Sequence, residues 1–223
     1  MFIGHFGLGF AVKAVAPRTS LGSLFLASEF LDLLWPVFMI MGIEGVMILP
    51  NTDTIIPIEF TNFPFSHSLA FVVLWSVLFI VMTFAMRQDW RSSIIMGLVV
   101  ASHWLLDAIV HVPDLQLFPG SHIRFGLGFW SSYAATLVSE FGIFFIGLWF
   151  YVRTTRADGR KGAYGLGFLV LILVLIYLAS LFGPPAPSVQ TIEWTNISIW
   201  MFVIWGYWLE RHRPPAEAGA PAR

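Results

Sequence analysis

The sequence contains no cysteine and few charged residues. Of its 223 residues, 57% are hydrophobic and only 11% are Asp, Glu, Lys or Arg. Without cysteine the chain forms no disulfide and offers no thiolate, so a metal ion would have to be held by His, Asp or Glu. The basic residues are scattered at the ends of apolar segments, which excludes a nucleic-acid-binding surface. With a mean hydropathy of +0.79, the composition predicts an integral membrane protein.

Apolar segments of about 20 residues, the length that crosses a bilayer, recur along the chain. Six are predicted to span, at 21–43, 67–86, 93–111, 131–152, 164–183 and 195–209. A shorter apolar segment, 1–16, precedes them and is predicted to enter the membrane and return, or to lie along its surface. The fold class is therefore an all-α integral membrane protein with six transmembrane helices plus a short N-terminal re-entrant or interfacial helix. Residues 1–210 form a single polytopic domain, and the Pro-rich segment 211–223 is predicted to be a disordered cytoplasmic tail.

The distribution of basic residues predicts the orientation. They precede the first span, separate the second from the third and the fourth from the fifth, and follow the sixth. The other loops contain a single basic residue, Arg124. By the positive-inside rule, both termini are cytoplasmic. Arginine far exceeds lysine, as in GC-rich bacteria, so the expected location is a bacterial plasma (inner) membrane.

Three polar residues interrupt the apolar segment IIMGLVVASHWLLDAIVH. His103, Asp107 and His111 are spaced i, i+4, i+8 and so lie on one face of one helix. Ionisable side chains within a membrane are costly and usually functional. Two imidazoles and a carboxylate also suit a zinc-like ion. The alternative is a polar clamp between helices, or a buried ion pair.

Other polar residues are expected near this face. If segment 1–16 enters the membrane, His5 reaches the depth of Glu29 and Asp32, and Pro36 is expected to kink the helix near Asp32. Each candidate also has an ordinary interpretation. His5 and His67 could be interfacial histidines, and His111, His122 and Asp114 could have ordinary loop roles. Glu29 and Glu140 could be protonated acids that bond to a neighbouring side chain. Arg124 could anchor the chain at a lipid phosphate.

The order of these residues resembles a known family. His5, Glu29/Asp32, His67-Ser68 and His103-x-x-x-Asp107 are similar, over residues 1–130, to the bacterial membrane-bound metal-dependent hydrolase family (YdjM-like), which is distantly similar to zinc-dependent phospholipase C. The resemblance implies metal ligands at Asp32, His67, His103 and Asp107, with His5 sharing Asp107 at a second ion. It further implies that His111, His122 and Glu140 are possible ligands of a third ion. The chain departs from the family at 62–64, where Asn-Phe-Pro replaces His-Arg-Gly.

The leading hypothesis is a membrane-embedded hydrolase that uses Zn²⁺ or a similar divalent metal. It would act on a lipid or lipid-linked phosphoester at the outer face of the plasma membrane. Glu29 or Glu140 would be the general base, and Arg124 would contact the substrate phosphate. Two further hypotheses are a non-catalytic subunit with fixed membrane-protein partners, and a transporter or a relay for protons or metal ions. In each case the partners are the lipid bilayer or other membrane proteins, and not a nucleic acid.

Overall fold

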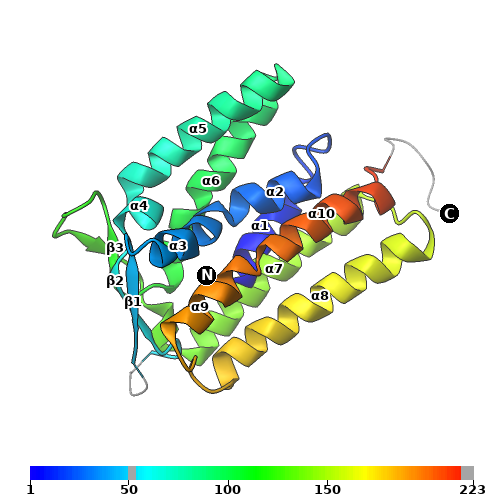
Figure 1. Ribbon diagram of the computed structural model, residues 1–223. Helices are drawn as coiled ribbons and strands as arrows, with labels where there is room; N and C mark the ends of the chain where they lie inside the picture. Colours follow the sequence, from blue (N-terminus) through cyan, green and yellow to red (C-terminus); the bar gives the residue numbers. More distant parts are fainter. Residues whose placement is uncertain (50–53, 217–223) are drawn as a thin grey trace.

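The chain folds into a bundle of helices with a small region of strands at one end (Figure 1). The computed structural model describes residues 1–49 and 54–216; the end of the predicted tail, 217–223, lies outside the described residues. Within these ranges four helices are long and apolar enough to cross a membrane. They are α5 (Leu69–Arg87), α6 (Trp90–Val110), α7 (Tyr133–Thr154) and α8 (Gly159–Phe182). Large apolar side chains cover the outward face of α5, as expected for a helix that contacts lipid.

The first predicted span is broken in two. Helices α2 (Leu21–Ser28) and α3 (Phe30–Ile40) meet at Glu29 with a bend of 55°, and together they are long enough for a fifth crossing. The sequence suggested a kink near Asp32, but the break lies at Glu29 and Pro36 is accommodated inside α3. The predicted span 195–209 falls on α9 (Val189–Ile197) and α10 (Trp200–His212), which are shorter helices separated by a turn. The described residues therefore contain four candidate spans, or five if the bent pair counts as one.

Short strands, which the all-α expectation did not include, lie beside α3 and α4 (Pro64–His67) (Figure 1). Strands β1 (Gly45–Ile48) and β2 (Ile58–Asn62) form an antiparallel hairpin, and β3 (Leu115–Gln116) pairs with β4 (Arg124–Phe125). A short 3₁₀ turn, η1 (Phe129–Ser131), leads into α7. The strands arise within Pro-rich polar loops, and β2 (IEFTN) contains only two β-branched residues, so little in the sequence indicates it.

Basic segments that are far apart in the sequence meet at one end of the bundle. The ammonium of Lys13, just after α1 (Ile3–Val12), lies 2.6 Å from a carboxylate oxygen of Glu210 on α10. Burial lowers the pKa of Lys13, and the Glu210 carboxylate opposes that shift. Further contacts join the same loops: Arg87 to Thr19, Arg91 to Val15, and Arg213 to Gly162.

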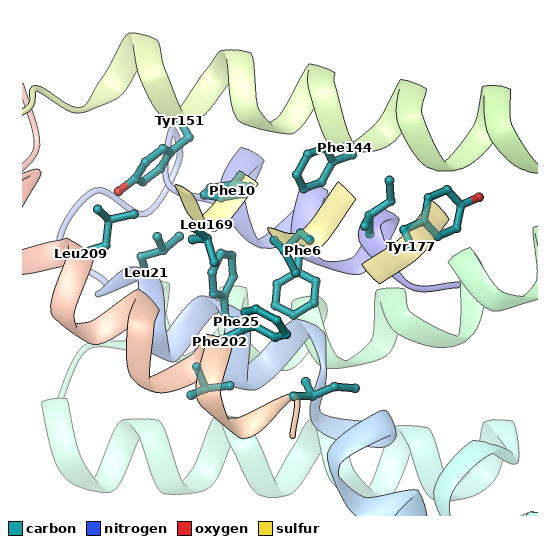
Figure 2. Close-up of a cluster of buried hydrophobic side chains, with 14 of the residues drawn as sticks. Phe6, Phe10, Leu21, Phe25, Phe144, Tyr151, Leu169, Tyr177, Phe202 and Leu209 are labelled. Carbon is teal, nitrogen blue, oxygen red and sulfur yellow. The ribbon is translucent and has the colours of Figure 1, made fainter. Parts of the chain in front are cut away.

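Helix α1 lies inside the bundle and not on its surface. Phe6 and Phe10 are fully buried, and each packs edge-on against Phe25 of α2 with ring centroids 5.0 Å apart. Figure 2 shows these rings within a cluster that includes side chains from α7, α8 and α10. Segment 1–16 therefore forms a helix that is enclosed by other helices of the bundle. The enclosed position is what brings His5 to the centre of the molecule.

The crossing of α1 and α7 requires glycine on both helices. A Cβ atom added to Gly7 would lie 2.7 Å from the Ile143 carbonyl oxygen, and one added to Gly147 would collide with the Gly7 carbonyl. Glycines of this kind let helix backbones approach closely in membrane proteins. Gly142, also on α7, has open space where its Cβ would be.

We therefore expect Gly147→Leu to separate α1 from α7 and to lower the thermal stability sharply or prevent folding, because overpacking at a helix crossing costs about 1–3 kcal/mol or more. Gly142→Leu is the matched control and should unfold like the wild type. Thermal unfolding in detergent, followed by circular dichroism, measures both. Equal midpoints for the two variants would show that the close crossing is unimportant.

Candidate metal centre

Five histidine and aspartate side chains from four helices converge near the strand end of the bundle. They are His5 of α1, Asp32 of α3, His67 of α4, and His103 and Asp107 of α6. They form two overlapping groups that could hold a metal ion, His5/His103/Asp107 and Asp32/His67/His103, each with ligand atoms within 4.8 Å of one another. The Asp32 side chain is 18% exposed, and the other four are buried.

The distances from His67 and His103 to the two aspartates are close to those between neighbouring ligands of a metal ion. His67 Nε2 lies 3.4 Å from Asp32 Oδ1 and 3.6 Å from Asp107 Oδ2. His103 Nε2 lies 3.6 Å and 3.2 Å from the same two oxygens. An ion that binds nitrogen and oxygen ligands tetrahedrally at about 2.0–2.2 Å separates neighbouring ligand atoms by about 3.3–3.6 Å. Each imidazole nitrogen therefore lies at a ligand spacing from both carboxylates, and Asp32, His67 and His103 form one group of three that could hold an ion.

A hydrogen bond at the other ring nitrogen fixes the tautomer of His103. His103 Nδ1 lies 2.7 Å from the Ser28 carbonyl oxygen, just before the break between α2 and α3. Because a carbonyl oxygen only accepts, Nδ1 carries the proton and donates it. The buried Nε2 has no hydrogen-bond partner in the described structure and is directed toward the two carboxylates, where a metal would bind. Ligating histidines are usually held this way.

A carboxylate and a hydroxyl orient His67 in the same manner. Ser66 Oγ donates to Glu44 Oε2 at 2.5 Å, which leaves it to accept a bond from His67 Nδ1 at 2.7 Å. Glu44 also accepts from the backbone N–H groups of Phe65 and Ser66 at the start of α4. Nε2 of His67 faces the carboxylates of Asp32 and Asp107. Neither Glu44 nor Ser66 was identified from the sequence, because they lie in a Pro-rich loop and gain their role only when β1 and α4 meet.

Glu44→Gln should weaken metal binding by about 10–100-fold, as loss of such a supporting group typically does. The amide cannot take both the backbone N–H bonds and the serine proton as the carboxylate does, so the His67 ring loses its fixed orientation. Zinc affinity measured by competition with a chelating dye tests this. Glu59→Gln, at an exposed carboxylate on β2, is the control, and equal affinity in the two variants would exclude the supporting role.

His5 lies on the other side of Asp107. Its Nε2 is 3.0 Å from Asp107 Oδ1, and its ring stacks on that of His103 with centroids 3.7 Å apart. The backbone amine of Met1 also contacts Oδ1 at 2.5 Å. The two oxygens of Asp107 thus face different partners: Oδ2 faces His67 and His103, and Oδ1 faces His5 and the N-terminal ammonium of Met1. Such a carboxylate can bridge two ions.

The two glutamates predicted as bases occupy different environments. Glu140 borders the cavity beside Asp107 and accepts hydrogen bonds from the backbone N–H groups of Phe2 and Gly4, so it also caps α1. Glu29 is buried at the α2–α3 break with no hydrogen-bond partner for either oxygen among the described residues. The structure does not place it at the wall of the cavity.

The remaining candidates lie farther from the cluster. His111 borders the same cavity, but its Nδ1 pairs with Asp114 at 2.9 Å, and its ring packs against Trp130. Exposed His122 belongs to neither metal-binding group. Arg124 contacts the Ser121 carbonyl oxygen and lines a separate outer cavity. The structure therefore brings together His5, Asp32, His67, His103 and Asp107, and leaves His122 and Arg124 outside the cluster.

Two cavities meet at this place. One of about 150 Å³ is bordered by Asp32, His67 and Asp107 together with side chains of α7, α8 and α9. The other, of about 430 Å³, lies between the strands and shares Ile58, Phe60 and Trp130 with the first. The cluster thus has access to a space that a small group of a substrate can enter.

No protein-family model matches the sequence, and no match was found among curated proteins or solved structures. The family resemblance of residues 1–130 accordingly stays a prediction, and the buried cluster is what supports a functional assignment.

Proposed function

We propose that the protein is a membrane-embedded metal-dependent hydrolase of lipid or lipid-linked phosphoesters. The observation that carries the proposal is the position of His67 Nε2 and His103 Nε2, each 3.2–3.6 Å from one oxygen of Asp32 and one of Asp107. Ligands of this kind favour zinc or a similar divalent ion. When bound, such an ion polarises a phosphoryl oxygen and lowers the pKa of a bound water.

The surrounding residues have distinct parts in this proposal. Asp107 joins the two halves of the cluster, with His5 at a second position beside its Oδ1. Ser28 and Ser66 keep the ring nitrogens of His103 and His67 in the ligating tautomer. Of the two predicted bases, Glu140 is better placed, because it borders the cavity that also contains Asp107. A base must lie within hydrogen-bonding reach of the proton that it takes.

The proposed membrane arrangement keeps both termini in the cytoplasm of a bacterium, with α9 and α10 as a broken sixth crossing. It is supported by the meeting of the basic segments at the Lys13–Glu210 end of the bundle. The strand end, with the His/Asp cluster near it, would then face outward. Because the chain has no cysteine, a single cysteine at His122 should react with an impermeant maleimide added outside intact cells, whereas one at Arg160 should not. The reverse labelling would overturn the orientation.

The direct test is hydrolysis by purified protein loaded with zinc. Two substrates are compared: a long-chain phosphatidic acid in mixed micelles and the water-soluble bis(4-nitrophenyl) phosphate. We expect turnover that disappears on removal of the ion with a chelator and returns when zinc is restored. An equal rate before and after chelation, or none with any divalent ion, would contradict the proposal.

A further inference from the structure

A groove between α8 and the α9–α10 pair adjoins the cavity at the metal centre. Its volume is about 310 Å³, and Figure 1 shows α8 running beside these two helices. The side chains that line it include Phe2, Ile176, Ser180, Asn196, Ile199 and Phe202. Phe2, Ser180 and Asn196 also border the cavity at the His/Asp cluster. The two spaces therefore share a wall, and the turn between α9 and α10 lies along the groove.

The other end of the groove reaches the outer surface of the bundle. Ile176 and Thr195 line the groove and are exposed, and the neighbouring Leu175 is 54% exposed. Phe182 and Trp194, close by on the same helices, are also exposed apolar side chains. In a membrane protein such a surface faces lipid. The groove thus opens on a face of the bundle that carries exposed apolar side chains.

The polar side chains in the groove are already bonded within their own helices. Ser180 Oγ donates to the Tyr177 carbonyl at 2.8 Å, and Asn196 Nδ2 donates to the Ile192 carbonyl at 2.9 Å. Ser198 Oγ likewise donates to the Thr195 carbonyl at 2.6 Å, and the remaining lining residues apart from Thr195 are Phe and Ile. An apolar occupant would leave these bonds intact, whereas a charged one would find no partner of opposite charge among the lining residues.

The cavity between the strands differs from the groove because charged side chains line it. The outer cavity of about 430 Å³ is bordered by Glu59, Asp114, Gln116 and Arg124, and it adjoins the metal-centre cavity at Phe60 and Trp130. A polar cavity, the His/Asp cluster and an apolar groove thus follow one another across the molecule. This order matches an amphiphile whose ester bond lies between its head group and its chain.

We propose that the groove between α8 and α9–α10 holds the hydrocarbon chain of the substrate, while the head group occupies the outer cavity. The proposal rests on the proposed hydrolase function and names the part of the substrate that each space receives. The chain enters sideways from the lipid, past Ile176 and Thr195. A volume of about 300 Å³ is at the lower end of ligand pockets, as expected for part of one chain.

Ile176→Trp tests the groove because a larger ring at its mouth fills the space. The measured quantity is the rate on long-chain phosphatidic acid divided by the rate on bis(4-nitrophenyl) phosphate, which has no chain. This ratio should fall about tenfold or more, since several buried methylene groups lose their contacts. Leu175→Trp places the same ring on the adjacent residue, which does not line the groove, and should leave the ratio unchanged. An unchanged ratio in Ile176→Trp, or an equal fall in both variants, would overturn the inference.

A second measurement separates failure of the groove from failure of the hydrolase. If the wild type hydrolyses neither substrate, the proposed function fails. The groove is then tested with a sixteen-carbon fatty alcohol that carries a terminal diazirine. Saturable photolabelling of Phe202 or Ile199 in the wild type and in Leu175→Trp, but not in Ile176→Trp, would support chain binding. Equal labelling in all three proteins would exclude it.

Discussion

His103→Ala should abolish metal binding at both positions of the cluster. His103 belongs to both groups of potential ligands, and its free Nε2 lies within 3.6 Å of Asp32 and 3.2 Å of Asp107. Without this ring, each position keeps too few ligands to form a closed site. His5→Ala, by contrast, should remove only the ion beside Asp107 Oδ1 and leave the other in place. Elemental analysis of the purified, zinc-loaded variants measures the difference.

The control for this experiment is His122→Ala, since His122 is exposed and outside both groups. It should keep the metal content of the wild type. The three variants must also elute as folded protein, because only folded protein gives an interpretable metal content. Wild-type metal content in His103→Ala would remove the cluster as the binding site, and loss of all metal in His5→Ala would show that the two positions fill only together.

Asp107→Asn should produce the largest loss of hydrolysis, about a thousandfold or more. Asp107 is shared between His5 on one side and His67 and His103 on the other, so the substitution removes a carboxylate that adjoins both groups of potential ligands. A bound ion contributes several kcal/mol to stabilisation of the transition state, and each 1.4 kcal/mol is about a factor of ten. The rate on bis(4-nitrophenyl) phosphate at saturating zinc measures the loss.

Glu193→Gln, a carboxylate-to-amide change on α9 outside the two groups, should hydrolyse the substrate like the wild type. If excess zinc restores Asp107→Asn to within about tenfold of the wild type, Asp107 helps to retain the ion but is not needed once it is bound. A wild-type rate in Asp107→Asn without added zinc would contradict a catalytic cluster altogether.

The sequence was most informative where one helix carries its own pattern. The length and apolarity of α5 to α8 are properties of continuous segments, so these spans could be predicted directly. His103 and Asp107 share a face because of their spacing along α6, and this needed no knowledge of the fold. Their meeting with Asp32 and His5 could be expected from a similar depth in the membrane and from the order of motifs in a resembling family, and the meeting with His67 from that order alone.

The features that the sequence did not predict depend on tertiary contacts. The break at Glu29 has no proline or glycine of its own, so the sequence pointed instead to Pro36. Glu44 and Ser66 are unremarkable loop residues until the hairpin packs against α4, and Glu140 caps α1 across a large separation in the chain. The groove beside α8 depends on how α9 and α10 turn at Ser198, which no local pattern specifies.

Zinc K-edge X-ray absorption of the zinc-loaded protein tests the central claim most directly. The account predicts a bound ion with a first shell of nitrogen and oxygen at about 2.0–2.2 Å and the outer-shell scattering of imidazole rings. The imidazole signal should decrease in His67→Ala, in which one ring of the cluster is removed. A protein that retains no ion after loading, or one whose ion shows no imidazole scattering, would contradict a metal centre built from His67, His103, Asp32 and Asp107.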